Sequence, residues 1–270
     1  MNQYAVVFLT WGEQYIKEVY SCITKSEKYL AGYDKVLITD GDTHIDDNDG
    51  QFTHVIRAEF KQQGLLRKTE LHEYLPDTYA GYLLLDSDTV IVEDISLGFK
   101  KAEIHGIAAS PAPHYSLDHF WGFDLVMKKE GVSTIGQLQY NTGVIFFKNK
   151  PRVKEVFKKW GLLGRSYQDE FTNDQPFFTL AMEQLEFNPY TLSISYNYRG
   201  FGEFISGDVR IWHSHGSMPE KINEYESAWP PRRAWPGRVE HAEQGDSGKL
   251  RSILRKFMRC LRRFTRPKPV

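Results

Sequence analysis

Two carboxylates, Asp86 and Asp88, stand between two apolar runs of the chain, residues 81–85 and residues 89–92. An apolar run without polar alternation indicates a strand buried on both faces of a sheet, whereas an isolated Asp pair would equally fit a turn. Open α/β sheets bind their ligands where the strands end. Because alternate residues of an extended chain point the same way, both carboxylates can face one hard cation. The segment therefore predicts an α/β fold and an Mg²⁺ or Mn²⁺ site that would hold a diphosphate.

Apolar runs alternate with amphipathic stretches along the first third of the chain. The runs predict strands at residues 4–10, 35–39, 54–57 and 82–85, and the stretches predict helices at residues 14–30 and 65–75. This alternation indicates βαβ units and a mainly parallel central sheet.

The middle of the chain continues the pattern with less regular spacing. Further strands are predicted at residues 104–109, 144–147 and 209–212, and further helices at residues 152–163 and 174–182. The last helix has Thr172, Asn173 and Asp174 as N-cap candidates, and Pro176 suits its first turn. The segment of residues 110–139 contains Pro, His and aromatic residues and is predicted to be a loop that shapes a substrate site.

The domain organisation follows from the length of 270 residues, which suits one large core. We expect residues 1–228 to form this domain, residues 229–248 to form a connector rich in Pro, Gly and charge, and residues 249–270 to form a basic tail. The two cysteines, Cys22 and Cys260, have no paired spacing, which favours a reducing, cytoplasmic setting. The chain start lacks a basic leader, and its apolar run is too short for a signal peptide or a membrane span.

The charge of the chain is distributed unevenly. Nine of its 34 Lys and Arg residues lie within residues 249–268, which contain no Asp or Glu, so 25 basic residues face 35 acidic ones in the remainder. An acidic body argues against nucleic acid as the main partner. In the tail, apolar residues recur at helical spacing with cations on the other faces. This pattern predicts a helix that lies on an anionic membrane surface, at the inner face of the membrane, although a disordered tail or a nucleic-acid-binding arm has the same composition.

Five segments, taken in order, resemble the GT-A glycosyltransferases, and most closely the family 8 type that includes glycogenin and bacterial lipopolysaccharide sugar transferases. The resemblance covers residues 4–221. The segments are Thr10-Trp11-Gly12, residues 65–72, residues 85–90, residues 140–145 with Asn173-Asp174-Gln175 after them, and His213 with Gly216 three residues on. The resemblance implies a Rossmann-like GT-A domain.

The resemblance also implies roles for individual residues. Asp86, Asp88 and His213 would bind Mn²⁺ or Mg²⁺, with His215 as the alternative ligand because the two histidines alternate on a strand. Asp174 and Gln175 would be the catalytic residues near the anomeric carbon. The implied donor-binding residues are Thr10, Trp11, Gly12, Asp40, Lys68, Ser87, Asn141, Gly143, His215 and Gly216. Simpler structural roles exist for several of them, such as an exposed helix lysine at Lys68 and helix capping at Asp174.

The implied activity is transfer of a hexose from a nucleotide sugar, with UDP favoured, to a saccharide or lipid-linked hydroxyl in bacterial cell-surface polysaccharide or lipopolysaccharide synthesis. Retention of anomeric configuration follows by analogy, while an inverting enzyme would use Asp174, Asp169 or Glu170 as base. One departure concerns Lys221, which comes later after Gly216 than the lysine of the family's Lys-Pro-Trp. Its role as a phosphate ligand is therefore not supported.

Two other functions fit part of the pattern. A non-catalytic module that binds nucleotide sugars would share the fold without turnover. A phosphatase of the haloacid dehalogenase type would use Asp86 as nucleophile, but its motif normally ends the first strand of the fold, and here three predicted strands precede it. A sugar nucleotidyltransferase would need a Gly-rich phosphate loop after the first strand, which Thr10-Trp11-Gly12 does not form.

Overall fold

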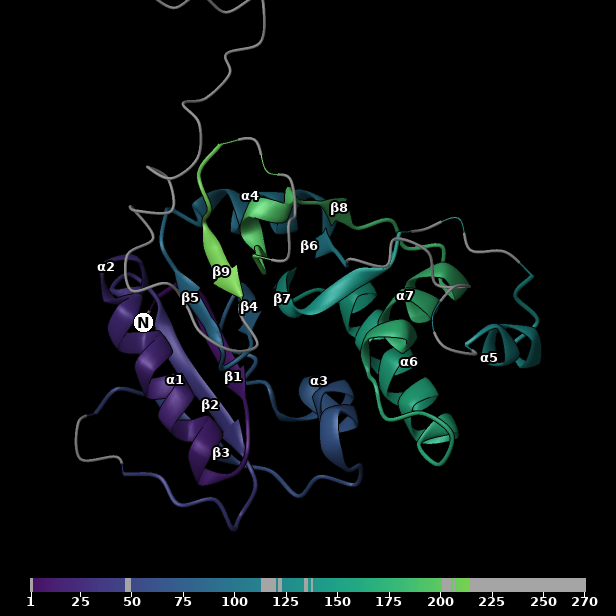
Figure 1. Ribbon diagram of the computed structural model, residues 1–270, viewed down its shortest axis with the longest axis horizontal. Coiled ribbons are helices and arrows are strands. Elements are labelled where there is room, and N and C mark those ends of the chain that lie inside the picture. The colour runs from purple at the N-terminus through teal and green to yellow at the C-terminus, as the bar shows by residue number, and fades with distance from the viewer. Residues whose placement is uncertain are drawn as a thin grey trace, which may run out of the picture. The chain divides into compact units, whose positions relative to one another are not determined.

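A seven-stranded sheet forms the centre of the described part of the chain in the computed structural model (Figure 1). The structure describes residues 2–46, 50–112, 120, 123–133, 136, 138–200, 205 and 207–213. The strand order is β3-β2-β1-β4-β7-β6-β8. These strands are β1 (Tyr4–Leu9), β2 (Asp34–Thr39), β3 (His54–Arg57), β4 (Gly81–Leu85), β6 (Ile107–Pro111), β7 (Tyr140–Lys148) and β8 (Tyr190–Thr191).

The strand directions confirm the predicted mainly parallel sheet. β3, β2, β1 and β4 are parallel neighbours, and β8 is parallel to β6. The exception is β7, which is antiparallel to both β4 and β6. Because β7 runs in reverse, its first residues lie beside the end of β4, where Leu85 pairs with Val144 and the Asp86 amide donates to the Gly143 carbonyl at 2.9 Å. The reversal brings two of the predicted site segments together.

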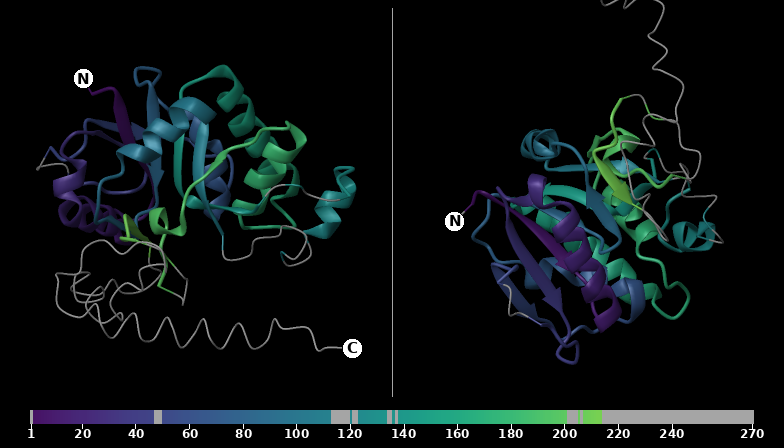
Figure 2. Two further views of the ribbon diagram at one scale, coloured as in Figure 1. Left: turned by 90° about the horizontal axis from the view of Figure 1, so that it is seen from above. Right: turned by 60° about the vertical axis from the view of Figure 1, so that its left-hand side comes forward.

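Helices cover both faces of the sheet (Figure 2). The helical segments are α1 (Glu13–Lys25), α2 (Glu27–Leu30), the 3₁₀ helix η1 (Gly64–Glu70), α3 (Leu71–Tyr74), α4 (Ser96–His105), α5 (Asp124–Lys129), α6 (Pro151–Tyr167), α7 (Gln175–Gln184) and the 3₁₀ helix η2 (Ile194–Tyr196). Alternate residues of β1 enter two cores: Val7 packs in the core that contains Trp160 of α6, and Phe8 packs in the core that contains Val19 of α1. Burial on both faces explains the continuous apolar strands of the sequence.

The predicted helix at residues 14–30 is two helices, α1 and α2, with Ser26 between them. Ser26 is fully buried, and its hydroxyl accepts a hydrogen bond from the amide of Ile91 at 2.9 Å. Hydrophobic periodicity does not show this break, because it coincides with a contact to Ile91, which is distant in sequence.

The predicted helix at residues 65–75 is mostly the 3₁₀ helix η1, and only α3 is α-helical. The buried carboxylate of Glu70 accepts from the backbone amides of Lys61 and Gln62 at 3.1 and 2.7 Å. These contacts join η1 to the loop before it. They hold the segment that carries Lys68.

The predicted strand at residues 104–109 begins too early. Ile104 and His105 end α4, Gly106 with φ of 84° terminates that helix, and β6 begins at Ile107. Ile104 is exposed, as a residue on the outer face of a helix would be. Helices commonly end at a glycine with a left-handed backbone. The helix end at Gly106 is not recognisable from the sequence because it lies within an apolar run.

The remaining elements agree with the sequence or refine it. Within the described part of the segment 110–139, which was predicted to be a loop, α5 is helical, and α6 and α7 extend the helices predicted at residues 152–163 and 174–182. None of the described helices is long and apolar enough to cross a membrane. The predicted connector and basic tail, residues 229–270, lie outside the described residues.

Candidate functional site

A second, two-stranded sheet brings His213 to the Asp86 and Asp88 carboxylates. It consists of β5 (Thr89–Ile91) and β9 (Ile211–His213), paired antiparallel with Thr89 opposite His213. Since β5 begins directly after Asp88, this register places the imidazole next to the turn that carries both carboxylates. The Thr89 hydroxyl closes that turn by donating to the Asp86 carbonyl at 2.7 Å.

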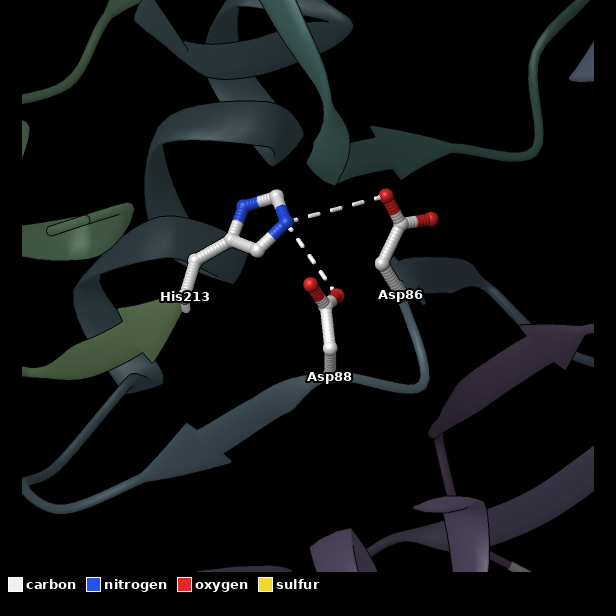
Figure 3. A group of neighbouring side chains, drawn as sticks. All are labelled: Asp86, Asp88 and His213. Carbon is white, nitrogen blue, oxygen red and sulfur yellow. Dashed lines mark ion pairs between the residues drawn. The ribbon is translucent and has the colours of Figure 1, made fainter. Parts of the chain in front are cut away.

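The three side chains converge on one point (Figure 3). Nε2 of His213 lies 3.3 Å from Oδ1 of Asp88 and 3.9 Å from Oδ2 of Asp86. One ligand atom from each residue lies within 4.8 Å of the other two. The imidazole is buried, whereas each carboxylate retains about 25% side-chain exposure. The structure therefore brings together all three predicted metal ligands, with an open side toward solvent.

The donor set fits a divalent cation. Two carboxylates and one imidazole suit Mn²⁺, and Mg²⁺ also accepts carboxylates. Three protein ligands leave coordination positions for phosphate oxygens, as in sites where the ion holds a substrate phosphate.

Gly143 lies against this cluster and leaves no room for a side chain. A Cβ atom at this position would overlap Cε1 of His213 and would lie 2.6 Å from Oδ2 of Asp86. Close approach of a backbone to a site is a frequent reason for glycine. Gly143, which is predicted to bind the donor, therefore makes space for two of the predicted metal ligands.

Lys68 belongs to the same site and is not an exposed helix lysine. It is buried, and its Nζ contacts Oδ1 of Asp86 at 2.6 Å. Burial alone would lower the pKa of Lys68, but the carboxylates of Asp86, Asp174 and Asp88 raise it above its ordinary value. The side chain therefore presents a permanent positive charge beside the carboxylates.

Asp174 lies at the N-terminus of α7 and is buried, with 3% exposure. Its side chain does not cap the helix; instead, Oδ1 of Asn173 accepts from the Gln175 amide at 2.9 Å. Burial raises the pKa of Asp174, against the opposing effects of the Lys68 cation and the Thr142 hydroxyl. Among the described residues, capping is therefore the role of Asn173, and the Asp174 carboxylate interacts with Lys68.

The two other base candidates differ from Asp174 in their surroundings. Asp169 and Glu170 are exposed, and Glu170 forms an ion pair with Lys129 of α5 at 2.8 Å. Their carboxylates are solvated on the surface, which leaves Asp174 as the buried acid of the three.

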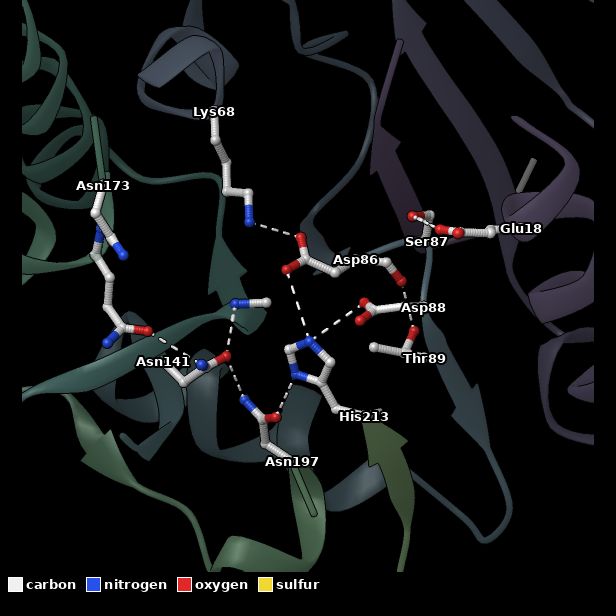
Figure 4. Close-up of polar contacts among 12 residues, drawn as sticks. Glu18, Lys68, Asp86, Ser87, Asp88, Thr89, Asn141, Asn173, Asn197 and His213 are labelled. Atoms are coloured by element: carbon white, nitrogen blue, oxygen red, sulfur yellow. Dashed lines mark hydrogen bonds and ion pairs between the residues drawn. The ribbon is translucent and has the colours of Figure 1, made fainter. Parts of the chain in front are cut away.

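A cavity of about 830 Å³ lies beside the carboxylates, between α1 and the turn after β4. It is lined by Thr10, Trp11, Lys68, Ser87, Asp86 and Asp88 among the predicted residues, and by Gln14, Tyr15, Glu18, Ser21, Cys22 and Lys25 from α1. Ser87 and Glu18 both line this cavity, and Ser87 donates to Glu18 at 2.9 Å (Figure 4). A volume of this size suits a ligand larger than a monosaccharide.

Gly12 and Asp40 support the cavity wall without lining it. Asp40 accepts from the amide and hydroxyl of Thr43 and pairs with Arg67 at 2.8 Å, while the Gly12 amide donates to the Thr43 hydroxyl at 2.7 Å. The Arg67 guanidinium lies over the Trp11 ring, 4.9 Å from its centroid. Burial would raise the pKa of Asp40, but the hydrogen bonds from Thr43 and Arg67 lower it. This network holds Trp11 in the cavity wall.

Asn141 and Gln175 contact each other and lie on the other side of the cluster. Nδ2 of Asn141 donates to Oε1 of Gln175 at 3.0 Å, and Oδ1 of Asn141 also accepts from Asn197, a fully buried residue that the sequence did not indicate. Asn197 follows the short helix η2 and has no motif around it. His215 and Gly216, and also Lys221, lie outside the described residues.

The fold of the chain is similar to that of GT-A glycosyltransferases of known structure. Galactosyltransferase LgtC in complex with donor and acceptor sugar analogues matches with a TM-score of 0.55 and 14% identity, over 78% of this chain and 87% of LgtC. Mouse xyloside xylosyltransferase 1 matches with a TM-score of 0.53 and 13% identity, over 80% and 99% of the two chains. The bifunctional glycosyltransferase WbbM matches with a TM-score of 0.57 and 13% identity, over 80% of this chain and 46% of WbbM.

These similarities confirm the predicted fold class. No protein-family model and no curated protein sequence matches the chain. At 13–14% identity the structural matches establish the fold, and the assignment to family 8 remains a prediction.

Proposed function

We propose that the protein is a metal-dependent glycosyltransferase that moves a hexose from a UDP-sugar to a saccharide hydroxyl. The observation that carries this proposal is the convergence of Asp86, Asp88 and His213 beside a cavity in a GT-A fold. A structural neighbour, LgtC, was solved with donor and acceptor sugar analogues, which supports a nucleotide-sugar donor and a saccharide acceptor. UDP is favoured through the sequence resemblance.

Each residue of the site has a role that follows from its chemistry. Asp86, Asp88 and His213 would hold Mn²⁺ or Mg²⁺, which when bound neutralises the charge that develops on the departing diphosphate. Lys68 adds a buried positive charge to the same region. Asn141, Asp174 and Gln175 would provide amide and carboxylate groups for the sugar.

The stereochemical outcome depends on whether Asp174 acts as a base. Its electrostatic interaction with Lys68 and its hydrogen bond with Thr142 support a role in which the carboxylate hydrogen-bonds sugar hydroxyls or stabilises positive charge at the anomeric carbon. Because the Asp174 carboxylate interacts electrostatically with the Lys68 cation, we favour a stabilising role over that of a base. This choice agrees with the retaining mechanism implied by the resemblance.

The proposal is tested by incubating the protein with UDP-sugars, GDP-sugars and other nucleotide sugars without acceptor. We expect slow release of UDP from at least one UDP-sugar, loss of this activity with EDTA, and recovery with Mn²⁺. Release of phosphate from simple phosphomonoesters, with nucleotide sugars left intact, would instead indicate a phosphatase with Asp86 as nucleophile. Binding of nucleotide sugars without either reaction would indicate a non-catalytic module.

We further propose that residues 249–268 bind an anionic membrane surface, so that the protein acts at the cytoplasmic face on a lipid-linked acceptor of cell-surface polysaccharide or lipopolysaccharide synthesis. The nine cations of this segment and its helically spaced apolar residues support the proposal. Each cation near an anionic surface contributes about 1 kcal/mol. Residues 249–268 lie outside the described residues.

Deletion of residues 248–270 is expected to release the protein from anionic liposomes, because the remaining body is acidic. Co-sedimentation with phosphatidylglycerol vesicles measures the effect, and neutral phosphatidylcholine vesicles are the control. Equal sedimentation of the full chain and the deletion variant would refute membrane binding by the tail.

A further inference from the structure

A chain of hydrogen bonds connects His213 to Gln175 through two asparagines (Figure 4). Nδ1 of His213 lies 2.7 Å from Oδ1 of Asn197, and Nδ2 of Asn197 lies 2.8 Å from Oδ1 of Asn141. Nδ2 of Asn141 lies 3.0 Å from Oε1 of Gln175. One predicted metal ligand and one predicted catalytic residue are therefore joined by side chains alone.

The direction of every bond in this chain is determined by one backbone group. The amide of Gly143 contacts Asn141 at 2.9 Å, and a backbone N–H can only donate, so the atom of Asn141 that it meets must be the oxygen. That oxygen also meets the Asn197 side chain, which must therefore present its nitrogen. The oxygen of Asn197 is then turned to His213, whose Nδ1 must carry a proton to donate to it.

The direction of these hydrogen bonds has a consequence for the residue at each end, His213 and Gln175. When Nδ1 of a neutral imidazole carries the proton, its Nε2 has the lone pair, and Nε2 is the atom that lies 3.3 and 3.9 Å from the carboxylates of Asp88 and Asp86. At the other end, Asn141 donates to the oxygen of Gln175, so the amino group of Gln175 is turned away from Asn141. Gln175 would thus offer a hydrogen-bond donor to a bound sugar.

We propose that Asn197 is a positioning residue that holds His213 in the Nδ1–H form required for metal ligation through Nε2, and that the Gly143 amide sets the orientation of the whole chain from His213 to Gln175. The proposal rests on the metal site of the proposed function. It adds a residue that acts on the metal only through His213, because Asn197 is fully buried behind the imidazole and contacts its far nitrogen. Outer partners of this kind orient a ligating histidine and fix its tautomer.

Mn²⁺ binding by Asn197 variants tests the first part of the proposal without any turnover. Asn197→Ala removes the acceptor for Nδ1–H and is expected to weaken Mn²⁺ binding by about 10- to 100-fold, as loss of such partners does elsewhere. Asn197→Asp retains an acceptor and is expected to restore binding to within a few fold of the wild type. It cannot donate to Asn141, but the Gly143 amide still donates to the Asn141 oxygen, so the bond from Asn141 to Gln175 is expected to remain.

Free Mn²⁺ measured by electron paramagnetic resonance gives the affinities. The matched control is Asn149→Ala, which removes an amide that donates to the carbonyls of Asp77 and Tyr79, outside the site. Weak binding by Asn197→Ala, with normal binding by Asn149→Ala and recovery in Asn197→Asp, supports the proposal. Equal affinity of Asn197→Ala and the wild type overturns it while leaving the metal site intact, and no Mn²⁺ binding by the wild type overturns both.

A spectroscopic measurement on the wild type tests the tautomer directly. In the Mg²⁺- and UDP-loaded protein labelled with ¹⁵N-histidine, His213 is expected to show a protonated Nδ1 and an unprotonated Nε2. The His213 signal is assigned by its absence in His213→Gln. A His213 ring with its proton on Nε2 and an unprotonated Nδ1 would overturn the proposal.

Discussion

Asp88→Asn is expected to reduce metal-dependent turnover by about 1,000-fold or more. Asp88 contributes one of two carboxylates in the cluster, and Oδ1 lies 3.3 Å from Nε2 of His213. An amide oxygen is a much weaker ligand for a hard cation than a carboxylate, and a bound cation contributes several kcal/mol to stabilisation of the leaving charge. At 1.36 kcal/mol for each factor of ten, a loss of about 4 kcal/mol corresponds to about 1,000-fold.

The measurement is Mn²⁺-dependent hydrolysis of the preferred nucleotide sugar, together with thermal unfolding without metal. We expect no loss of stability in Asp88→Asn, because the variant relieves repulsion between neighbouring carboxylates of the metal-free site. The control, Asp77→Asn, changes the same group in an exposed ion pair with Lys154 and should leave turnover unchanged. Full activity of Asp88→Asn would show that Asp88 is not a metal ligand.

Gly143→Ala is expected to disrupt the metal site without changing any ligand. The added Cβ would overlap His213, lie 2.6 Å from Asp86 Oδ2 and lie 3.0 Å from Asn141 Oδ1. At least one of these groups must move, and His213 is buried with little space to do so. We expect Mn²⁺ affinity to fall by about 100-fold or more, and overpacking to lower the free energy of unfolding by about 1–3 kcal/mol.

Titration with Mn²⁺ and denaturant unfolding measure the two effects. Gly32→Ala is the matched control, because a Cβ at Gly32 would meet no atom within 4 Å and its backbone is not left-handed. This control should bind Mn²⁺ as the wild type does. Wild-type Mn²⁺ affinity in Gly143→Ala would show that the ion does not sit between Asp86 and His213.

The sequence predicts the parts of the fold that depend on local pattern. The buried strand at residues 81–85 is predicted from its continuous hydrophobicity, and the two carboxylates are identified because they directly follow this strand. The order of the five segments identifies His213 as the third metal ligand implied by the resemblance. The predictions failed where a distant group decides the backbone, as at Ser26, whose hydroxyl binds the amide of Ile91 in β5. At Gly106 a left-handed residue ends a helix inside an apolar run.

The supporting residues of the site were not predictable for a related reason. Asn197 lies in an irregular segment, and its role depends on the pairing of β5 with β9, which places His213 beside it. Thr43 joins Gly12 to Asp40 through a loop that has no periodic pattern. Single polar residues of this type acquire a function from tertiary contacts, and a motif records only the residues near one another in sequence.

The most direct test of the metal site is a crystal structure of the protein with Mn²⁺ and UDP. We expect anomalous signal from one Mn²⁺ ligated by Asp86, Asp88 and Nε2 of His213, with the diphosphate completing its coordination. A structure in which UDP is bound and manganese is absent from these three side chains, or is ligated elsewhere, would contradict the proposed mechanism.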